Sequence, residues 1–166
     1  MPSRRDLLRL GPAGDERTVP YAGPVDRAEL IAYVRSQRDA VVASVGPDGA
    51  PQAAYLTIAA TDQGELVFDA KPESRKVVNL RRDPRVAIVV GGRDGTTLQC
   101  EGAADLPDGD DLVRCAAAYV DAFPEFAASV RAGGVVVIRV HVEWARYGDF
   151  RGSLPDVRTV DIAAAR

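Results

Sequence analysis

Short apolar runs separated by turn residues fill the chain from Ala40 to Ala104, and this pattern constrains the fold more than any other feature. The first two runs, Ala40 to Val45 and Pro51 to Ala60, flank Gly-Pro-Asp-Gly, which is typical of a hairpin turn. Thr-Asp-Gln-Gly separates the second run from a third, Glu65 to Ala70. These features predict an antiparallel meander. Further strands are expected at Arg85 to Val90, Thr96 to Ala104, Val135 to Trp144 and Val157 to Ile162.

Helices are predicted in the connections. Asp26 offers an N-cap with Glu29 three residues later, which predicts a helix that ends near Arg38. Three more are expected: a short basic helix after Ser74, an alanine-rich helix from Asp108 to Ala122, and a short helix opened by Pro124. About six strands with helices inserted between them indicate a mainly β fold, a closed or partly closed antiparallel barrel.

The composition is that of one compact domain. The chain has 166 residues, 46% of them hydrophobic. We assign residues 25–166 to the domain and residues 1–24, which are polar and rich in glycine and proline, to an N-terminal arm. No apolar run could span a bilayer, and Met1 to Gly14 lacks the apolar core of a secretion signal, so we expect a cytoplasmic protein without a membrane partner.

Charge and cysteine content exclude two further classes. The formal net charge is -3 with both signs interspersed, so the sequence lacks the clustered basic residues that are typical of nucleic-acid-binding proteins. Cys100 and Cys115 have no metal-ligand spacing, so we expect buried, reduced thiols and no metal site.

The start of the basic helix carries a combination of residues that suits a phosphate. The N-terminus of a helix presents N–H groups without intrahelical partners and a partial positive charge. Ser74 adds a hydroxyl, Arg75 a planar fork of donors and Lys76, one of two lysines in the chain, a point charge. The alternative is an N-cap serine followed by two solvated cations.

Several segments together resemble the pyridoxamine 5'-phosphate oxidase-like superfamily of flavin-binding proteins. The segments are Val42 to Val45 with Pro47 to Gln52, Leu66 to Phe68, Ser74 to Leu80 running into Asp83 to Val86, Cys100 to Ala104, and Trp144 to Tyr147. The resemblance spans Glu29 to Phe150. It implies an FMN-binding split β-barrel of antiparallel Greek-key type, assembled as a homodimer with cofactor sites at the interface.

The resemblance also implies which residues bind the cofactor. Arg75 and Lys76, with Ser74, would hold its phosphate, and Asp69 and Ala70 would lie near the ribityl-phosphate portion. Because a carboxylate repels a phosphate, any contact from Asp69 would be through its backbone.

Three further positions complete the implied site. Thr97 occupies the strand position where the vitamin B6 oxidases use a glutamine near the flavin ring. Trp144 and Arg146 fall where the second subunit closes over the cofactor. The alternatives are that Trp144 covers the barrel core and that Arg146 meets a surface carboxylate. His141, the only histidine, favours a solvent-facing or core-edge role.

The sequence departs from the vitamin B6 oxidases themselves. Where they carry an arginine and a lysine along the second strand, this chain has Ala54 and Ala59, and no histidine follows Trp144. We therefore expect an FMN-binding oxidoreductase with a different, small-molecule substrate. No paired carboxylates or Cys/His dyad is evident, so no catalytic side chain is assigned and the cofactor would carry the chemistry.

Two alternatives remain open. One is a reductase that uses the deazaflavin coenzyme F-420 in place of FMN. The other is a non-catalytic flavin- or haem-binding dimeric module, and a haem would need His141 as its axial ligand.

Overall fold

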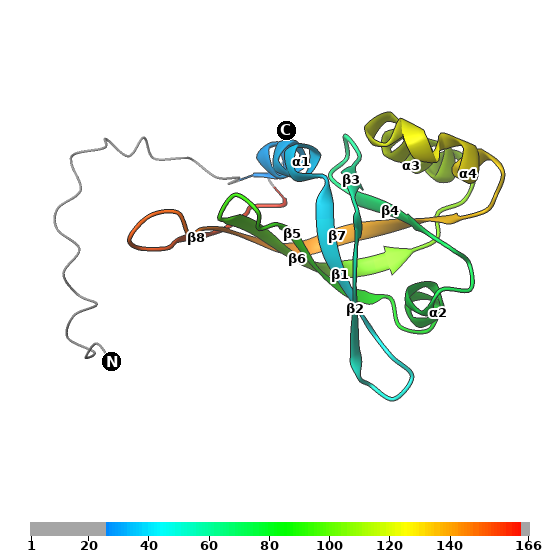
Figure 1. The fold of residues 1–166 in the computed structure, drawn as a ribbon, viewed down its shortest axis with the longest axis horizontal. Coiled ribbons are helices and arrows are strands. Elements are labelled where there is room, and N and C mark those ends of the chain that lie inside the picture. The colour runs from blue at the N-terminus through cyan, green and yellow to red at the C-terminus, as the bar shows by residue number, and fades with distance from the viewer. Residues whose placement is uncertain (1–25, 164–166) are drawn as a thin grey trace, which may run out of the picture.

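The computed structural model describes residues 26–163. The predicted arm, residues 1–24, lies outside this range. An eight-stranded antiparallel sheet dominates the described chain and curls into a half-barrel (Figure 1). The fold is a split β-barrel, as predicted. The strands are β1 (Asp39–Val45), β2 (Pro51–Thr57), β3 (Ala59–Ala60), β4 (Leu66–Ala70), β5 (Arg85–Gly91), β6 (Thr96–Asp105), β7 (Val136–Asp149) and β8 (Asp156–Thr159).

The strand order is β2-β1-β5-β6-β7-β4-β3, with β8 added along the second half of β7. The β1–β2 hairpin closes through Gly46 to Gly49, and Gly49 takes the positive φ of 82° that this turn needs. Tight local turns therefore fix the neighbours in the first part of the sheet. The long β7 pairs with β6, β4 and β8, and it joins the two parts of the half-barrel.

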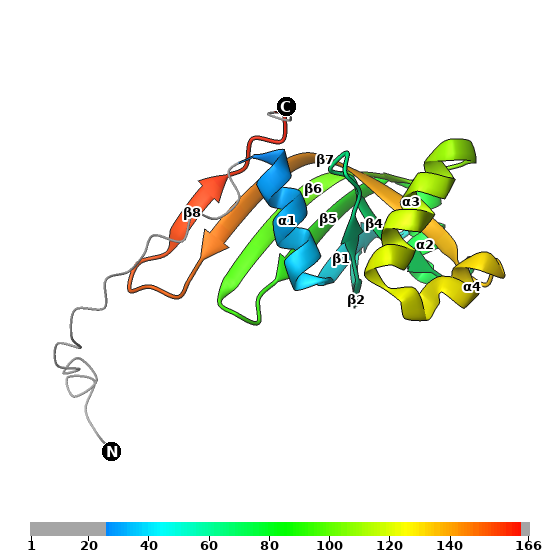
Figure 2. The same ribbon diagram turned by 90° about the horizontal axis from the view of Figure 1, so that it is seen from above.

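Residues 26–163 contain five helical segments: α1 (Arg27–Gln37), which precedes β1, and, in the connections between strands, α2 (Arg75–Arg82), α3 (Gly109–Ala122), a 3-10 turn (Pro124–Phe126) and α4 (Ala127–Arg131). Asp26 caps α1 as predicted, because its carboxylate accepts a hydrogen bond of 2.9 Å from the Glu29 N–H. Figure 2 shows α1 lying across the concave side of the sheet, whereas α3 and α4 lie together at one end.

The buried apolar side chains of the described residues form two clusters. The larger fills the half-barrel and includes Val42, Phe68, Ile88, Leu98 and Ile138, all nearly inaccessible to solvent. The smaller lies between α3 and the opposite face of β3, β4 and β7, and its members are Ala59, Val67, Cys115, Tyr119, Phe123 and Val137. Both faces of β4 are therefore buried, and Cys100 and Cys115 are buried free thiols as expected.

The structure differs from the predicted elements in two strands. The strand expected from Pro51 to Ala60 is divided at Ile58, whose N–H turns to the carbonyl of Arg38, and its two parts join opposite edges of the sheet. The strand expected to end at Trp144 continues to Asp149. A register shift in the β6–β7 ladder leaves Glu143 as an extra residue between Val142 and Trp144. Among residues 26–163, no helix is long and apolar enough to cross a membrane.

Candidate cofactor site

Helix α2 begins with a group of unsatisfied polar atoms. Ser74 is its N-cap, but the hydroxyl makes no capping hydrogen bond, and Ser74 Oγ is buried with no hydrogen-bond partner in the described chain. Arg75 is exposed and Lys76 half-buried, and within residues 26–163 neither forms an ion pair or a side-chain hydrogen bond. The first turn contains no acidic residue. Free N–H groups, an unused hydroxyl and two unpaired cations therefore meet at one helix end.

The inner face of α2 holds this helix end in place. Val77 and Leu80 are buried in the barrel core. Asn79, 2% exposed, donates from Nδ2 to Ser44 Oγ on β1 and to Gln52 Oε1 on β2, each at 3.0 Å. These contacts fix α2 relative to the first hairpin.

Asp69 and Ala70 lie at the end of β4, and their side chains contact Tyr119 and the barrel core, respectively. The Asp69 carboxylate accepts a hydrogen bond of 3.0 Å from the Tyr119 hydroxyl, which is also 2.8 Å from Thr57 Oγ1. Burial raises the pKa of Tyr119, so this hydroxyl stays protonated. Ala70 packs in the barrel core. The Asp69 carboxylate is therefore engaged by Tyr119, and a backbone contact of Asp69 with a phosphate stays a prediction.

Thr97, Trp144 and Arg146 lie together on the outer face of β6 and β7. Thr97 pairs with Gly148, Gln99 with Arg146, and Glu101 with Trp144. Arg146 donates a hydrogen bond of 2.8 Å to Gln99, and its guanidinium carbon lies 5.7 Å from the centre of the Trp144 ring. Trp144 does not cover the barrel core, and Arg146 contacts no carboxylate in the described chain.

The predicted residues thus form two groups. Ser74, Arg75 and Lys76 are adjacent at α2, and Thr97, Trp144 and Arg146 share a strand face. Within residues 26–163, no hydrogen bond, ion pair or ring contact links the two groups.

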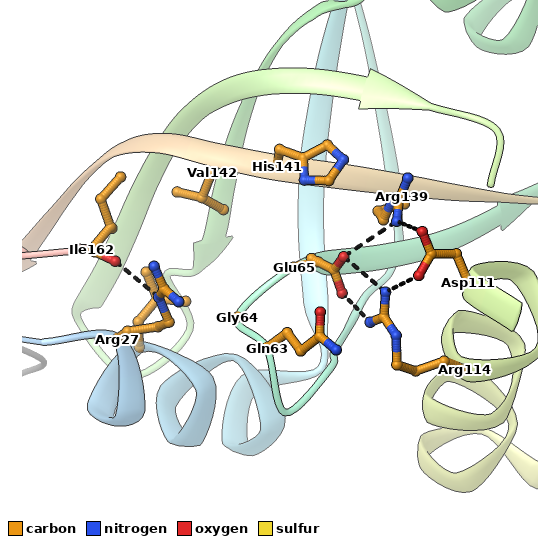
Figure 3. Close-up of a pocket in the computed structure, with 11 residues that line it drawn as sticks. Arg27, Gln63, Gly64, Glu65, Asp111, Arg114, Arg139, His141, Val142 and Ile162 are labelled. Atoms are coloured by element: carbon orange, nitrogen blue, oxygen red, sulfur yellow. Dashed lines mark hydrogen bonds and ion pairs between the residues drawn. The ribbon is translucent and has the colours of Figure 1, made fainter. Parts of the chain in front are cut away.

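The structure also contains a cavity that no sequence motif indicated. It has a volume of about 520 Å³ and lies between the N-terminal ends of α1 and α3, the β3–β4 turn and β7 (Figure 3). Its wall is an ion network centred on Glu65, whose carboxylate accepts hydrogen bonds from Arg114, Arg139 and Thr61. Arg139 also pairs with Asp105 and Asp111, each at 2.6 Å.

This network is satisfied internally. Burial by itself raises the pKa of Glu65, but the hydrogen bonds from Arg114 and Thr61 and the charges of both arginines together lower it. A second groove of about 780 Å³ runs between α1 and α3. Neither space is lined by any of the eight residues predicted to bind the cofactor.

A comparison with protein families identifies the chain. Residues 27–148 match the model of the pyridoxamine 5'-phosphate oxidase family. Since this match covers most of the chain, the protein belongs to that family, as its sequence motifs predicted. No curated protein matches the chain.

Solved structures with the same fold differ in what they bind. A conserved hypothetical protein from Mycobacterium tuberculosis is 30% identical, with a TM-score of 0.62 over 75% of this chain and 84% of the other. A haem-binding protein from Mycobacterium smegmatis is 22% identical, with a TM-score of 0.67 over 80% of this chain and 57% of the other. An FMN-binding pyridoxamine 5'-phosphate oxidase-related protein from Nostoc punctiforme is 15% identical, with a TM-score of 0.58 over 78% and 85%. The last two likenesses concern the fold alone.

Proposed function

We propose that the protein is an FMN-binding oxidoreductase that holds the phosphate of FMN at the N-terminus of α2. The observation that carries this proposal is the buried Ser74 hydroxyl, which has no hydrogen-bond partner in the described chain, beside the unpaired Arg75 and Lys76. A buried donor without a partner costs stability unless a ligand or water satisfies it. Two adjacent cations at a helix start are also repelled by the positive end of the helix dipole. A bound phosphate would neutralise their charge and remove this repulsion.

The chemistry of the donor set fits a phosphate monoester. Ser74 supplies a hydroxyl, Arg75 a guanidinium and Lys76 an ammonium group, and the uncapped helix end supplies backbone N–H groups. When bound, the flavin supplies hydride or electron transfer. The residues of this chain bind and orient it. Asn79 holds α2 in position, and the outer face of β6 and β7 offers polar groups and aromatic surface for the rest of the cofactor.

We infer that the substrate is not a phosphorylated B6 vitamer. Ala54 is half-buried on β2, and Ala59 is buried against α3, so neither position can supply a cation to a substrate phosphate. We infer a different small-molecule substrate, and we assign no catalytic side chain.

A second copy of the chain would complete the site. Tyr55, Val41 and Val89 form one row across the outer faces of β2, β1 and β5, and they are 60%, 40% and 40% exposed. Beside this row lies a row of three alanines, Ala53, Ala43 and Ala87. An apolar surface of this kind, continuous with Arg146 and Trp144 on β7, suits a symmetric contact between two copies. The dimer would bring the α2 group of one subunit towards the β7 group of the other.

A titration with FMN, followed by the quenching of flavin fluorescence, tests the phosphate assignment. Lys76→Ala, and the double variant Arg75→Ala with Lys76→Ala, remove charge-assisted hydrogen bonds, so we expect affinity to fall about tenfold or more for each contact. Arg81→Ala is the matched control, because Arg81 is an exposed cation in the last turn of α2. An unchanged dissociation constant in the double variant would contradict the assignment. Parallel titrations with coenzyme F-420 distinguish a deazaflavin reductase.

Haem binding is the second candidate function. It is favoured by the fold shared with haem proteins from Mycobacterium smegmatis and Vibrio cholerae. His141, the only histidine, has a half-exposed side chain whose Nε2 lies 3.7 Å from Asp105 Oδ2. If His141 is an axial ligand, the Soret band of the haemin-loaded protein will shift or vanish in His141→Ala. A retained band would exclude that ligand.

A further inference from the structure

The ring of Phe150 lies over the backbone of β7 at Gly148. A Cβ placed on Gly148 would come within 2.7 Å and 2.8 Å of two ring carbons, Cε2 and Cζ, and within 3.4 Å of Thr97 Oγ1. The glycine therefore leaves the space that the phenyl ring occupies. Phe150 is nevertheless 52% exposed, so one side of the ring remains open to solvent.

The backbone around Phe150 is fixed, although its ring is exposed. The Phe150 N–H donates a hydrogen bond of 2.9 Å to the carbonyl of Gly95 in the β5–β6 turn. Asp149 and Arg151 form a two-pronged ion pair at 2.9 Å and 2.5 Å. An aromatic ring attached to a fixed backbone can bind a planar group with little loss of conformational freedom.

Along the outer face of β7, aromatic and polar groups alternate. Trp144 lies at one end, Phe150 over Gly148 at the other, and Arg146 with Gln99 between them. Four residues of extended strand separate Trp144 from Gly148, a distance of about 13 Å, which accommodates a fused three-ring system lying flat. Thr97 adds a hydroxyl beside Phe150. Aromatic surface at both ends and hydrogen-bonding groups in the middle match a planar heteroaromatic ligand.

We propose that Phe150 stacks on the ring system of the bound flavin, and that Gly148 is a glycine because a side chain there would displace the Phe150 ring. This inference rests on the proposed function, which supplies the planar ligand. It adds Phe150, as a residue that stacks on the ring system, to the eight residues predicted from the sequence.

Titrations with FMN and with riboflavin, which lacks the phosphate, test the proposal. Phe150→Ala should weaken the binding of both flavins by the same factor, about three- to tenfold, since a stacked aromatic pair contributes this much. Phe150→Leu, which keeps an apolar side chain, should lose affinity but less than alanine. Leu154→Ala is the control, because Leu154 is 82% exposed in the same β7–β8 connection.

Gly148→Ala provides a second variant that leaves Phe150 in place. Its new methyl group should push the ring aside and weaken both flavins, whereas in the Phe150→Ala background the same change should have little effect. Equal effects of Gly148→Ala in both backgrounds would overturn the role assigned to the pair.

The outcomes also separate this inference from the proposed function. If Lys76→Ala weakens FMN but not riboflavin, while Phe150→Ala changes neither, the phosphate site stands and the Phe150 inference fails. If the unmodified protein binds neither flavin, both are overturned.

Discussion

Gly102 on β6 lies directly against the backbone carbonyl of His141 on β7. A Cβ placed on Gly102 would come within 2.0 Å of the His141 oxygen, closer than any side chain could tolerate. This contact lies at the register shift, where Glu143 is the extra residue. Before the shift Ile138 and Val140 point into the core, and after it Ala145 and Tyr147 do. The bulge therefore moves Trp144 and Arg146 to the outer face, where they can meet a ligand.

Replacing Gly102 by alanine should destabilise the protein. The methyl group would meet the backbone of β7 at His141 and Val142, so β6 and β7 must separate there. We expect a loss of about 1–3 kcal/mol in the free energy of unfolding. Urea denaturation followed by circular dichroism measures it. Gly134→Ala is the matched control, because the nearest atom to its new Cβ would be 3.7 Å away. Equal midpoints for the two variants would mean that the bulge accommodates a side chain.

Replacing Asn79 by alanine should loosen α2. Asn79 Nδ2 donates hydrogen bonds to the buried Ser44 Oγ and to Gln52 Oε1. The loss of these two hydrogen bonds should lower the free energy of unfolding by about 1–3 kcal/mol. If α2 holds the phosphate, the affinity for FMN should fall too, although Asn79 does not belong to the phosphate group. Val78→Ala serves as the control, since Val78 is 54% exposed on the same helix. If Asn79→Ala loses the expected free energy of unfolding but binds FMN with unchanged affinity, the packing of α2 does not contribute to FMN binding.

Local signals explain what could be predicted from the sequence. Asp26 with Glu29 marks a helix start within a few residues, and Gly-Pro-Asp-Gly and Thr-Asp-Gln-Gly mark turns, so the meander and α1 follow from short segments. Ser74 was correctly expected to start a basic helix. The alternation of apolar residues, however, does not show that the run from Pro51 to Ala60 divides at Ile58. That division depends on the Arg38 carbonyl in another element.

Features that depend on distant partners escaped prediction. Glu65 meets Arg114 and Arg139, which are 49 and 74 residues away, and no spacing rule connects an acid with arginines at such separations. The contact of Phe150 with Gly148 depends on how the chain turns after β7. The predicted cofactor residues came from the family resemblance, and the structure arranges them in two groups whose joint role is still a prediction.

Both cysteines should resist thiol reagents in the native protein. Burial raises the pKa of Cys100 to about 12 and also raises that of Cys115, so the reactive thiolate is scarce at neutral pH. The chain contains two cysteines, so Ellman's reagent should report no fast thiol in the folded protein and two after denaturation in guanidinium chloride. A fast-reacting thiol in the native state would show that α3 or β6 opens readily.

The Glu65 network should make stability depend on acid pH. The folded pKa of Glu65 lies below its ordinary value of 4.5, so its stabilising effect is complete above that pH and is lost as the pH falls through the folded pKa. Asp105 contributes in the same direction, because the hydrogen bond from Arg139 lowers its pKa. Glu65→Gln removes the charge and leaves Arg114 and Arg139 short of a partner. We expect Glu65→Gln to lower the free energy of unfolding by about 3 kcal/mol at pH 7. The difference in free energy of unfolding between this variant and the unmodified protein should narrow below about pH 4.

The melting temperature measured by calorimetry from pH 3 to pH 8 tests this expectation. Asp62→Asn is the control, because the Asp62 side chain is 92% exposed in its pair with Arg35, where solvent screens the interaction. That variant should follow the unmodified protein throughout. Parallel curves for Glu65→Gln and the unmodified protein down to pH 3 would mean that Glu65 is not the titrating group. The acid sensitivity would then belong to Asp105 at the end of β6 and to Asp111 on α3, which both pair with Arg139.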